Sequence, residues 1–231
     1  MSTAPEVEGR RSALLLSFVG GFVDTFGFVV LFGLFMAHVT GNFVLIGATL
    51  ARHGHHGLVG KLLALPTFIV AVAAARWLQR RRERRGLESA RFLVALQLSL
   101  LLAFMACGLL AEPLVDPDAI AVVATGLVGV AAMAFQNAAS RSAFAQLSPT
   151  TVMTGNVTQA TMDLVDLALD DAPAASTRAR IAKMWPPIVA FAVGALTGGL
   201  LCSALGFAVL LLPAVALLVL WWRLGRPPDG P

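Results

Sequence analysis

The residues of this chain that could do chemistry are polar side chains inside long apolar runs. Asp24 is the clearest case, because it interrupts the apolar run 12–32. An ionisable group at the bilayer centre costs about 2.5–3.5 kcal/mol on insertion scales, so it normally faces protein or water. Two interpretations stay open for Asp24. It could bind a proton or pair with a cation in alternation with a solute, or it could accept hydrogen bonds from the ends of broken helices.

Two copies of a Thr-Gly-Asn sequence form the second candidate. Thr40-Gly41-Asn42 recurs as Thr154-Gly155-Asn156, displaced by 114 residues. Threonine can cap a helix N-terminus, glycine allows a tight turn and the asparagine amide offers donors and an acceptor. Each copy precedes a short apolar helix whose positive end would attract anions or carbonyl oxygens. The alternative is that the two turns only hold the halves of the chain together.

Three further polar residues lie next to these turns. His38 precedes the first turn and could titrate near neutral pH, although a neutral histidine bridging two helices is an equal alternative. Gln136 and Asn137 end an apolar run as adjacent amides. They could bind a solute or satisfy the broken backbone before the second turn. We expect these residues to form a solute- or ion-binding site with Asp24 and both turns.

Two other clusters have simpler interpretations. Asp163, Asp166 and Asp170 share one helix face, which we expect to be solvated; the alternatives are a vestibule for cations or pairing with Arg178, Arg180 and Lys183. His53, His55 and His56 form a short cluster that could bind a metal weakly. A polar loop explains the three histidines better, and we expect no metal site and no cofactor.

The amino-acid composition indicates what kind of structure holds these residues. Of 231 residues, 58% are apolar and 13% are charged, and the mean hydropathy is +0.80. A soluble domain is nearer 25% charged, so lipid must be the solvent for much of this surface. A soluble enzyme is excluded, and nucleic acid is not an expected partner. Six segments are long enough to cross a bilayer: 12–32, 57–78, 90–111, 118–138, 182–202 and 205–222.

The segments 42–51 and 156–168 are helix-like but too short to cross. If both dip into the membrane and return, most Lys and Arg residues fall on one side, which the positive-inside rule makes cytoplasmic. The N-terminal run resembles a signal peptide, but we interpret it as an uncleaved first span. These observations predict a multi-pass protein of the bacterial inner membrane with both termini in the cytoplasm.

The repeated turns also predict an internal symmetry. The chain is expected to be one transmembrane domain, with repeat halves at about 12–112 and 118–223 and polar tails at 1–11 and 224–231. Three crossings in each half would turn the second half upside down. The predicted fold is therefore an all-α polytopic membrane protein with about six transmembrane helices, two short re-entrant half-helices and an inverted 3+3 repeat. Such repeats place binding sites near the midplane.

Four ordered motifs make the chain resemble a known family. They are Gly20-Gly21-Phe22-Val23-Asp24, the segment from Met36 to Asn42, Phe135-Gln136-Asn137-Ala138 and the segment from Thr150 to Asn156. In these motifs the chain resembles the YoaK-like family of bacterial membrane proteins, over nearly its whole length. The function of that family is unknown. The resemblance therefore implies a bacterial inner-membrane protein and supplies no substrate, mechanism or site residue.

Together these features favour a small-solute transporter or channel, with a midplane site between two opposed Thr-Gly-Asn turns and proton coupling through Asp24. The alternative is a membrane assembly or regulatory protein that moves no solute and whose turns are structural. An enzyme is not expected. The expected partners are membrane lipid and a small polar or anionic solute, and the small-residue segment 194–199 would also allow a homodimer.

Overall fold

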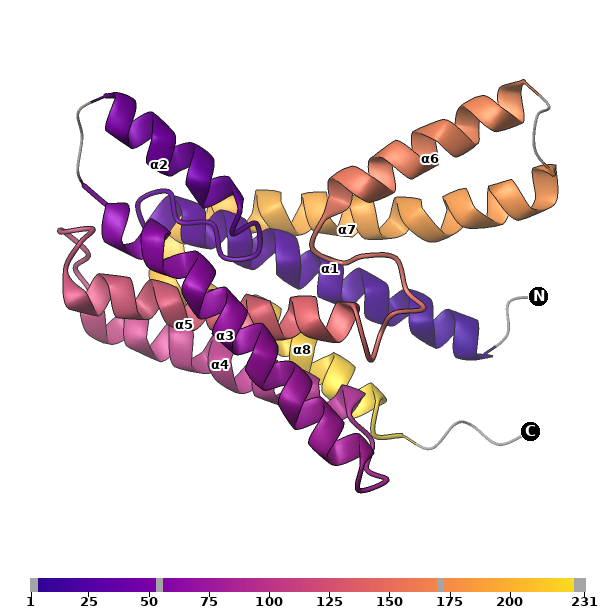
Figure 1. Cartoon of the computed structure of the whole chain (residues 1–231), viewed down its shortest axis with the longest axis horizontal. Coiled ribbons are helices and arrows are strands. Elements are labelled where there is room, and N and C mark those ends of the chain that lie inside the picture. The colour runs from indigo at the N-terminus through magenta and orange to yellow at the C-terminus, as the bar shows by residue number, and fades with distance from the viewer. Residues whose placement is uncertain (1–3, 53–55, 170–172, 227–231) are drawn as a thin grey trace.

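The computed structural model describes residues 4–52, 56–169 and 173–226, and all of the regular structure in them is helical. Figure 1 shows a bundle whose long helices run roughly along the longest axis. In chain order the helices are α1 (Ala4–Val30), α2 (Gly41–Ala51), α3 (Leu58–Glu83), α4 (Ala90–Ala111), α5 (Ile120–Ser140), α6 (Met153–Ala168), α7 (Ala174–Leu205), the 3-10 helix η1 (Gly206–Leu210) and α8 (Leu211–Arg223).

Five apolar stretches are long enough to cross a membrane: Gly9–Val30, Leu58–Glu83, Ala90–Ala111, Ile120–Ser140 and Ala174–Arg223. The last stretch reverses direction, because the chain turns at Gly206, which has a positive φ, before α8 runs back along the bundle (Figure 1). The prediction of an all-α, multi-pass membrane protein is therefore confirmed. The boundaries differ most at α1 and α7, each of which begins eight residues before its predicted span, 12–32 and 182–202.

The closest helix crossing joins α1 to α7. A Cβ atom at Gly21 would overlap the backbone carbonyl of Phe191, and one at Gly194 would overlap that of Phe18. Glycine at both positions lets the two backbones approach until no side chain separates them. The predicted small-residue segment 194–199 thus packs inside the bundle at Gly194 and Gly198.

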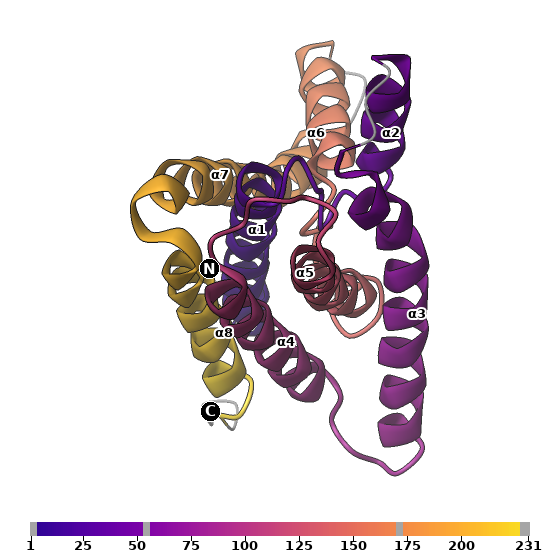
Figure 2. The ribbon, with the colours of Figure 1, turned by 90° about the vertical axis from the view of Figure 1, so that its left-hand side faces the viewer.

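The short helices α2 and α6 project from one side of this bundle (Figures 1 and 2). Each begins near the middle of the molecule, and they diverge towards opposite ends. α2 packs against α3, and α6 packs against α7. The connection between α1 and α2 therefore reaches the middle of the bundle, where it meets the side chain of Asp24.

Candidate functional site

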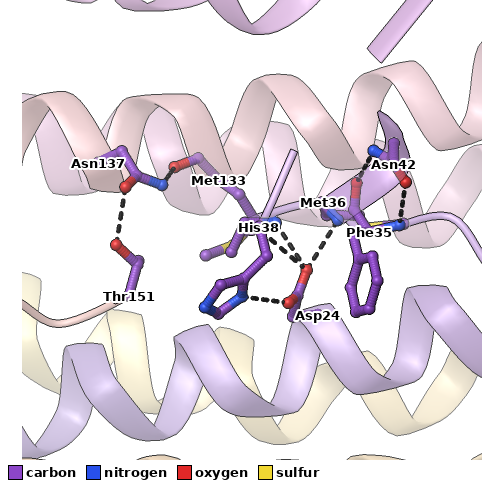
Figure 3. A network of polar contacts seen from close by, with 9 residues as sticks. Asp24, Phe35, Met36, His38, Asn42, Met133, Asn137 and Thr151 are labelled. Atoms are coloured by element: carbon purple, nitrogen blue, oxygen red, sulfur yellow. Dashed lines mark hydrogen bonds and ion pairs between the residues drawn. The ribbon is translucent and has the colours of Figure 1, made fainter. Parts of the chain in front are cut away.

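The carboxylate of Asp24 is the centre of the site. Its side chain leaves α1 and is almost fully buried, at 4% exposed. Oδ1 accepts hydrogen bonds from the backbone N–H groups of Met36 at 2.8 Å and Ala37 at 2.7 Å (Figure 3). The N–H of His38 is a third, longer donor at 3.5 Å. Backbone donors of this kind stabilise the ionised form of a buried carboxyl group.

The second oxygen of Asp24 binds His38. Oδ2 lies 2.6 Å from Nδ1 of the imidazole, which is the length of a strong, charge-assisted hydrogen bond. This bond to Asp24 raises the pKa of His38, which lies in the connection between α1 and α2, above its ordinary value of 6.5. The other ring nitrogen, Nε2, points away from Asp24 in Figure 3 and has no hydrogen bond to any described residue.

A cavity of about 580 Å³ opens beside this pair. Its polar wall is formed by Asp24, Thr25, His38 and Thr40, together with the backbone at Gly41. Its apolar wall is formed by the rings of Phe28, Phe35 and Phe191. The volume falls in the usual range for small-molecule sites, which are mostly apolar with a few polar groups.

The sequence did not predict the aromatic part of this cavity. Phe28 lies four residues after Asp24 and so shares its helix face, and Thr25 lies three residues before Phe28, so both could have been found from that spacing. Phe191 comes from α7, and its ring packs edge-on to the ring of His38, with centroids 5.8 Å apart. No local pattern in the sequence indicates that contact.

The first Thr-Gly-Asn turn forms the edge of the cavity, with a different role for each residue. Asn42 is buried and pairs with the backbone of Phe35, donating from Nδ2 to the carbonyl and accepting at Oδ1 from the N–H. A Cβ at Gly41 would lie 2.9 Å from the ring of Phe35, so this position needs glycine. Thr40 is exposed and lines the cavity.

The prediction that both threonines cap their helices is wrong. Thr40 occupies the N-cap position of α2 in a helical conformation, and its side chain makes no capping bond. Thr154 lies inside α6, which begins at Met153. The predicted anion-attracting end of α2 also has partners already: the N–H groups of Gly41, Asn42 and Phe43 donate to the carbonyls of residues 38–40.

The second turn does not line the cavity. Thr154 and Gly155 are exposed, and no atom lies within 4 Å of a Cβ placed at Gly155. Asn156 is buried and donates to the carbonyl of Pro149 at 2.9 Å. Of the predicted site residues, the structure thus brings Asp24, His38, Thr40 and Gly41 to one cavity, with Asn42 supporting its wall, and it leaves the second turn outside.

The two amides at the end of α5 hold the chain before the second turn. Asn137 accepts a hydrogen bond from the hydroxyl of Thr151 at 2.7 Å and donates to the carbonyl of Met133 (Figure 3). Gln136 is fully buried, donates to the carbonyl of Leu16 and accepts from Gln97, a residue that the sequence analysis did not single out. Neither amide bonds the backbone before the second turn: their carbonyl partners, Leu16 and Met133, lie in α1 and α5, and their contacts to that connection are with the hydroxyls of Thr150 and Thr151.

Asp163 is not solvated. It is fully buried on α6, where it accepts two hydrogen bonds from the guanidinium of Arg180 on α7, at 2.8 and 3.1 Å, and one from Gln159. The bonds from Arg180 lower the pKa of Asp163. The expectation of a solvated face is therefore wrong for Asp163, and pairing with Arg180 replaces it. Asp166 is partly buried, and Asp170 lies outside the described residues.

Of the histidine cluster, only His56 belongs to the described residues, and it does not line the cavity. His56 is exposed, whereas His53 and His55 lie outside the described residues. Among the described residues, no three His, Cys, Asp or Glu side chains are grouped as metal ligands.

Comparison with known proteins identifies a family and no activity. The family model described as "Protein of unknown function (DUF1275)" matches residues 12–222, which include every helix from α2 to η1 and most of α1 and α8. No curated protein and no solved structure matches the chain.

Proposed function

The chain belongs to the DUF1275 family, the YoaK-like membrane proteins of unknown function, and from the geometry around Asp24 we propose that it is a small-solute transporter or channel coupled to protons. The observation that carries this proposal is the pair Asp24–His38. It is a buried carboxylate bonded to an imidazole whose second nitrogen is free, beside a cavity of about 580 Å³.

The pairing of helices supports an inverted repeat. If α1–α4 correspond to α5–α8, each contact between the halves should have a counterpart. The contact of α1 with α7 then matches that of α5 with α3, and the contact of α4 with α5 matches that of α8 with α1. Within the halves, α2 on α3 matches α6 on α7. This agreement is what a two-fold relation in the membrane plane would produce.

The hydrogen bonds at the two turns support the same relation. Asn42 donates to the carbonyl of Phe35, and Asn156 donates to that of Pro149. Both partners are displaced by 114 residues, as the turns themselves are. Each bond ties the start of a short helix to the chain before it, so the second turn repeats the architecture of the first without its charged pair.

The lengths of the short helices support re-entrant segments. α2 has 11 residues and α6 has 16, which gives about 16 and 24 Å at 1.5 Å per residue. Neither length reaches the hydrocarbon thickness of about 30 Å. Since the helices diverge from the middle towards opposite ends (Figure 1), they would enter from opposite faces. Non-helical backbone at that depth requires protein or water around it, as the connection 31–40 has at Asp24.

In this proposal the coupling proton is held by the pair and enters through His38. Backbone N–H groups bond Oδ1 of Asp24, so proton uptake and release would fall to Nε2 of the imidazole, the ring nitrogen without a hydrogen bond among the described residues. The solute would bind Nε2 and the hydroxyls of Thr25 and Thr40, and its apolar part would contact the three phenylalanine rings. A small polar solute with an apolar part fits this lining.

Flux in proteoliposomes tests the proposal. Purified full-length protein would be reconstituted with a trapped pH-sensitive dye and given a panel of small acids, amines and neutral polar solutes. We expect at least one solute to drive proton movement, and we expect Asp24→Asn and His38→Gln to remove it. Asp116→Asn changes an exposed acid of the α4–α5 connection and serves as the matched control.

Two results would contradict the proposal. Proton-coupled flux that is unchanged in both site variants would show that the pair is not the coupling site. The absence of flux for every solute, from correctly folded wild-type protein, would favour the alternative, in which the turns are structural and no solute moves.

A further inference from the structure

Arginines gather where α3 ends, α4 begins and α8 ends. These three helix ends lie at the same end of the molecule (Figures 1 and 2), and α4 packs on α8. The arginines are Arg80, Arg81, Arg82, Arg84, Arg85, Arg91, Arg223 and Arg226. In the described part of the chain, only Arg80 among them forms an ion pair, with Glu83 at 3.8 Å. So many cations without an ion-pair partner give this end of the molecule a positive surface potential, which attracts anions.

Nearby acids do not neutralise this cluster. Glu88 accepts hydrogen bonds from the backbone N–H groups of Ala90 and Arg91 and so caps the start of α4. Glu83 accepts a hydrogen bond from Gln79. Since both carboxylates have other partners, the guanidinium groups of Arg91 and Arg226 keep their charge available to an external anion.

Aromatic rings fix two of these guanidinium groups in place. The guanidinium of Arg91 lies 4.1 Å from the centre of the Trp221 ring, and that of Arg226 lies 3.5 Å from the Trp222 ring. The Nε atom of Arg91 is buried and has no hydrogen-bond partner among the described residues. Stacked guanidiniums lose little further side-chain freedom when they bind a planar or tetrahedral oxyanion.

The depth of the cluster indicates the kind of anion. Trp221 and Trp222 end the apolar helix α8, and tryptophan at such a position lies at the level of lipid headgroups. Arg91 begins the apolar helix α4 at the same level. An oxyanion bound between these side chains would therefore be at headgroup depth, with apolar helix surface on its membrane side.

We propose that the corner formed by Arg91, Trp221, Trp222 and Arg226 is a binding site for the phosphate of an anionic phospholipid in the adjacent leaflet. Arg82, which stacks on Phe92 at 4.4 Å, extends the site along the start of α4. The lipid would bridge α4 of the first half to α8 of the second. This site lies outside the Asp24 cavity and does not depend on transport.

Quenching by brominated lipid tests the site directly. Full-length protein with Trp77→Phe and Trp185→Phe keeps only the two tryptophans of the corner. It would be reconstituted in mixtures of brominated and ordinary lipid, with phosphatidylglycerol or phosphatidylcholine as the brominated component. We expect brominated phosphatidylglycerol to quench the tryptophan fluorescence at a several-fold lower mole fraction than brominated phosphatidylcholine. This preference should weaken at high salt, because salt screens the attraction between exposed charges.

Removing an arginine from the corner should reduce the preference for phosphatidylglycerol over phosphatidylcholine. Arg91→Gln and Arg226→Gln are each expected to lower the preference for phosphatidylglycerol, on the order of five-fold for each arginine lost. Arg52→Gln, which removes an exposed arginine after α2, is the matched control and should change nothing. If Arg91→Gln does not fold, the Arg226→Gln variant and the salt dependence of the wild-type lipid preference still test whether the corner binds anionic lipid.

Two outcomes would overturn the proposal. Equal quenching by the two brominated lipids, at low salt and in the wild-type background, would show that the corner does not select anionic lipid. Complete loss of the preference with millimolar inorganic phosphate at constant ionic strength would show that the site binds free phosphate and not a lipid.

Discussion

At the scale of the residue, the hydrogen bond from His38 to Asp24 controls how readily the imidazole is protonated. The pKa of His38 is raised by its hydrogen bond to Asp24, so the imidazolium form persists to higher pH than in an ordinary histidine and is lost as pH rises through that pKa. We expect Asp24→Asn to lower the pKa of His38 towards or below 6.5. Imidazole resonances in NMR spectra, assigned to His38 by their loss in His38→Gln, would measure the change. An unchanged midpoint in Asp24→Asn would contradict this assignment.

The two glycines of the repeated turn should respond differently to the same change. A Cβ at Gly41 would meet the ring of Phe35 at 2.9 Å, whereas a Cβ at Gly155 has open space. We therefore expect Gly41→Ala to destabilise the protein by about 1–3 kcal/mol, in the range of overpacking. Gly155→Ala, inside α6, should be neutral or stabilise by up to about 1 kcal/mol. Thermal unfolding in detergent compares the two, and equal shifts would count against the contact at Phe35.

At the scale of the element, α6 is held on α7 by the ion pair between Asp163 and Arg180. We expect Asp163→Asn to weaken that contact, because a neutral amide replaces the carboxylate that accepts both guanidinium bonds. Hydrogen exchange of the α6 amides should become faster, while α1 is unaffected. Asp166→Asn, three residues along the same helix, removes a charge that acts on Arg180 without a hydrogen bond, and it should have a smaller effect. Unchanged exchange in Asp163→Asn would show that apolar packing alone holds α6.

The sequence predicted the helices better than the contacts between them. Apolar runs long enough to cross a bilayer identified α1, α3, α4, α5 and the pair α7 and α8, because span length is set by the solvent and is visible in composition. For Asp24 the sequence offered hydrogen bonds from helix ends as one alternative, but the observed donors are the N–H groups of residues 36–38, which lie in the non-helical connection between α1 and α2. Phe191 and Gln97 could not be found, because their contacts depend on how distant helices cross.

At the scale of the whole molecule, the distribution of Lys and Arg predicts which ends of the helices are cytoplasmic. Cys107 and Cys202 would be replaced, and single cysteines would be placed at His56 and Ala174, which lie in the α2–α3 connection and at the start of α7. An impermeant thiol reagent on intact cells should label position 56 alone. Labelling of both positions, or of neither, would place the two short helices on the same side of the membrane and would contradict the inverted repeat.

The close crossing of α1 and α7 has a consequence for how the protein is made. α1 is synthesised first, but the glycine surface that receives it, at residues 194–198, is made only after most of the chain has entered the membrane. During that interval Asp24 would face lipid without its final neighbours. Its main partners, however, are the backbone N–H groups of Met36 and Ala37 and the ring of His38, all within 14 residues. The newborn chain can therefore supply hydrogen-bond donors to the Asp24 carboxyl group long before the glycine surface of α7 exists, which makes an acidic residue in α1 compatible with early insertion.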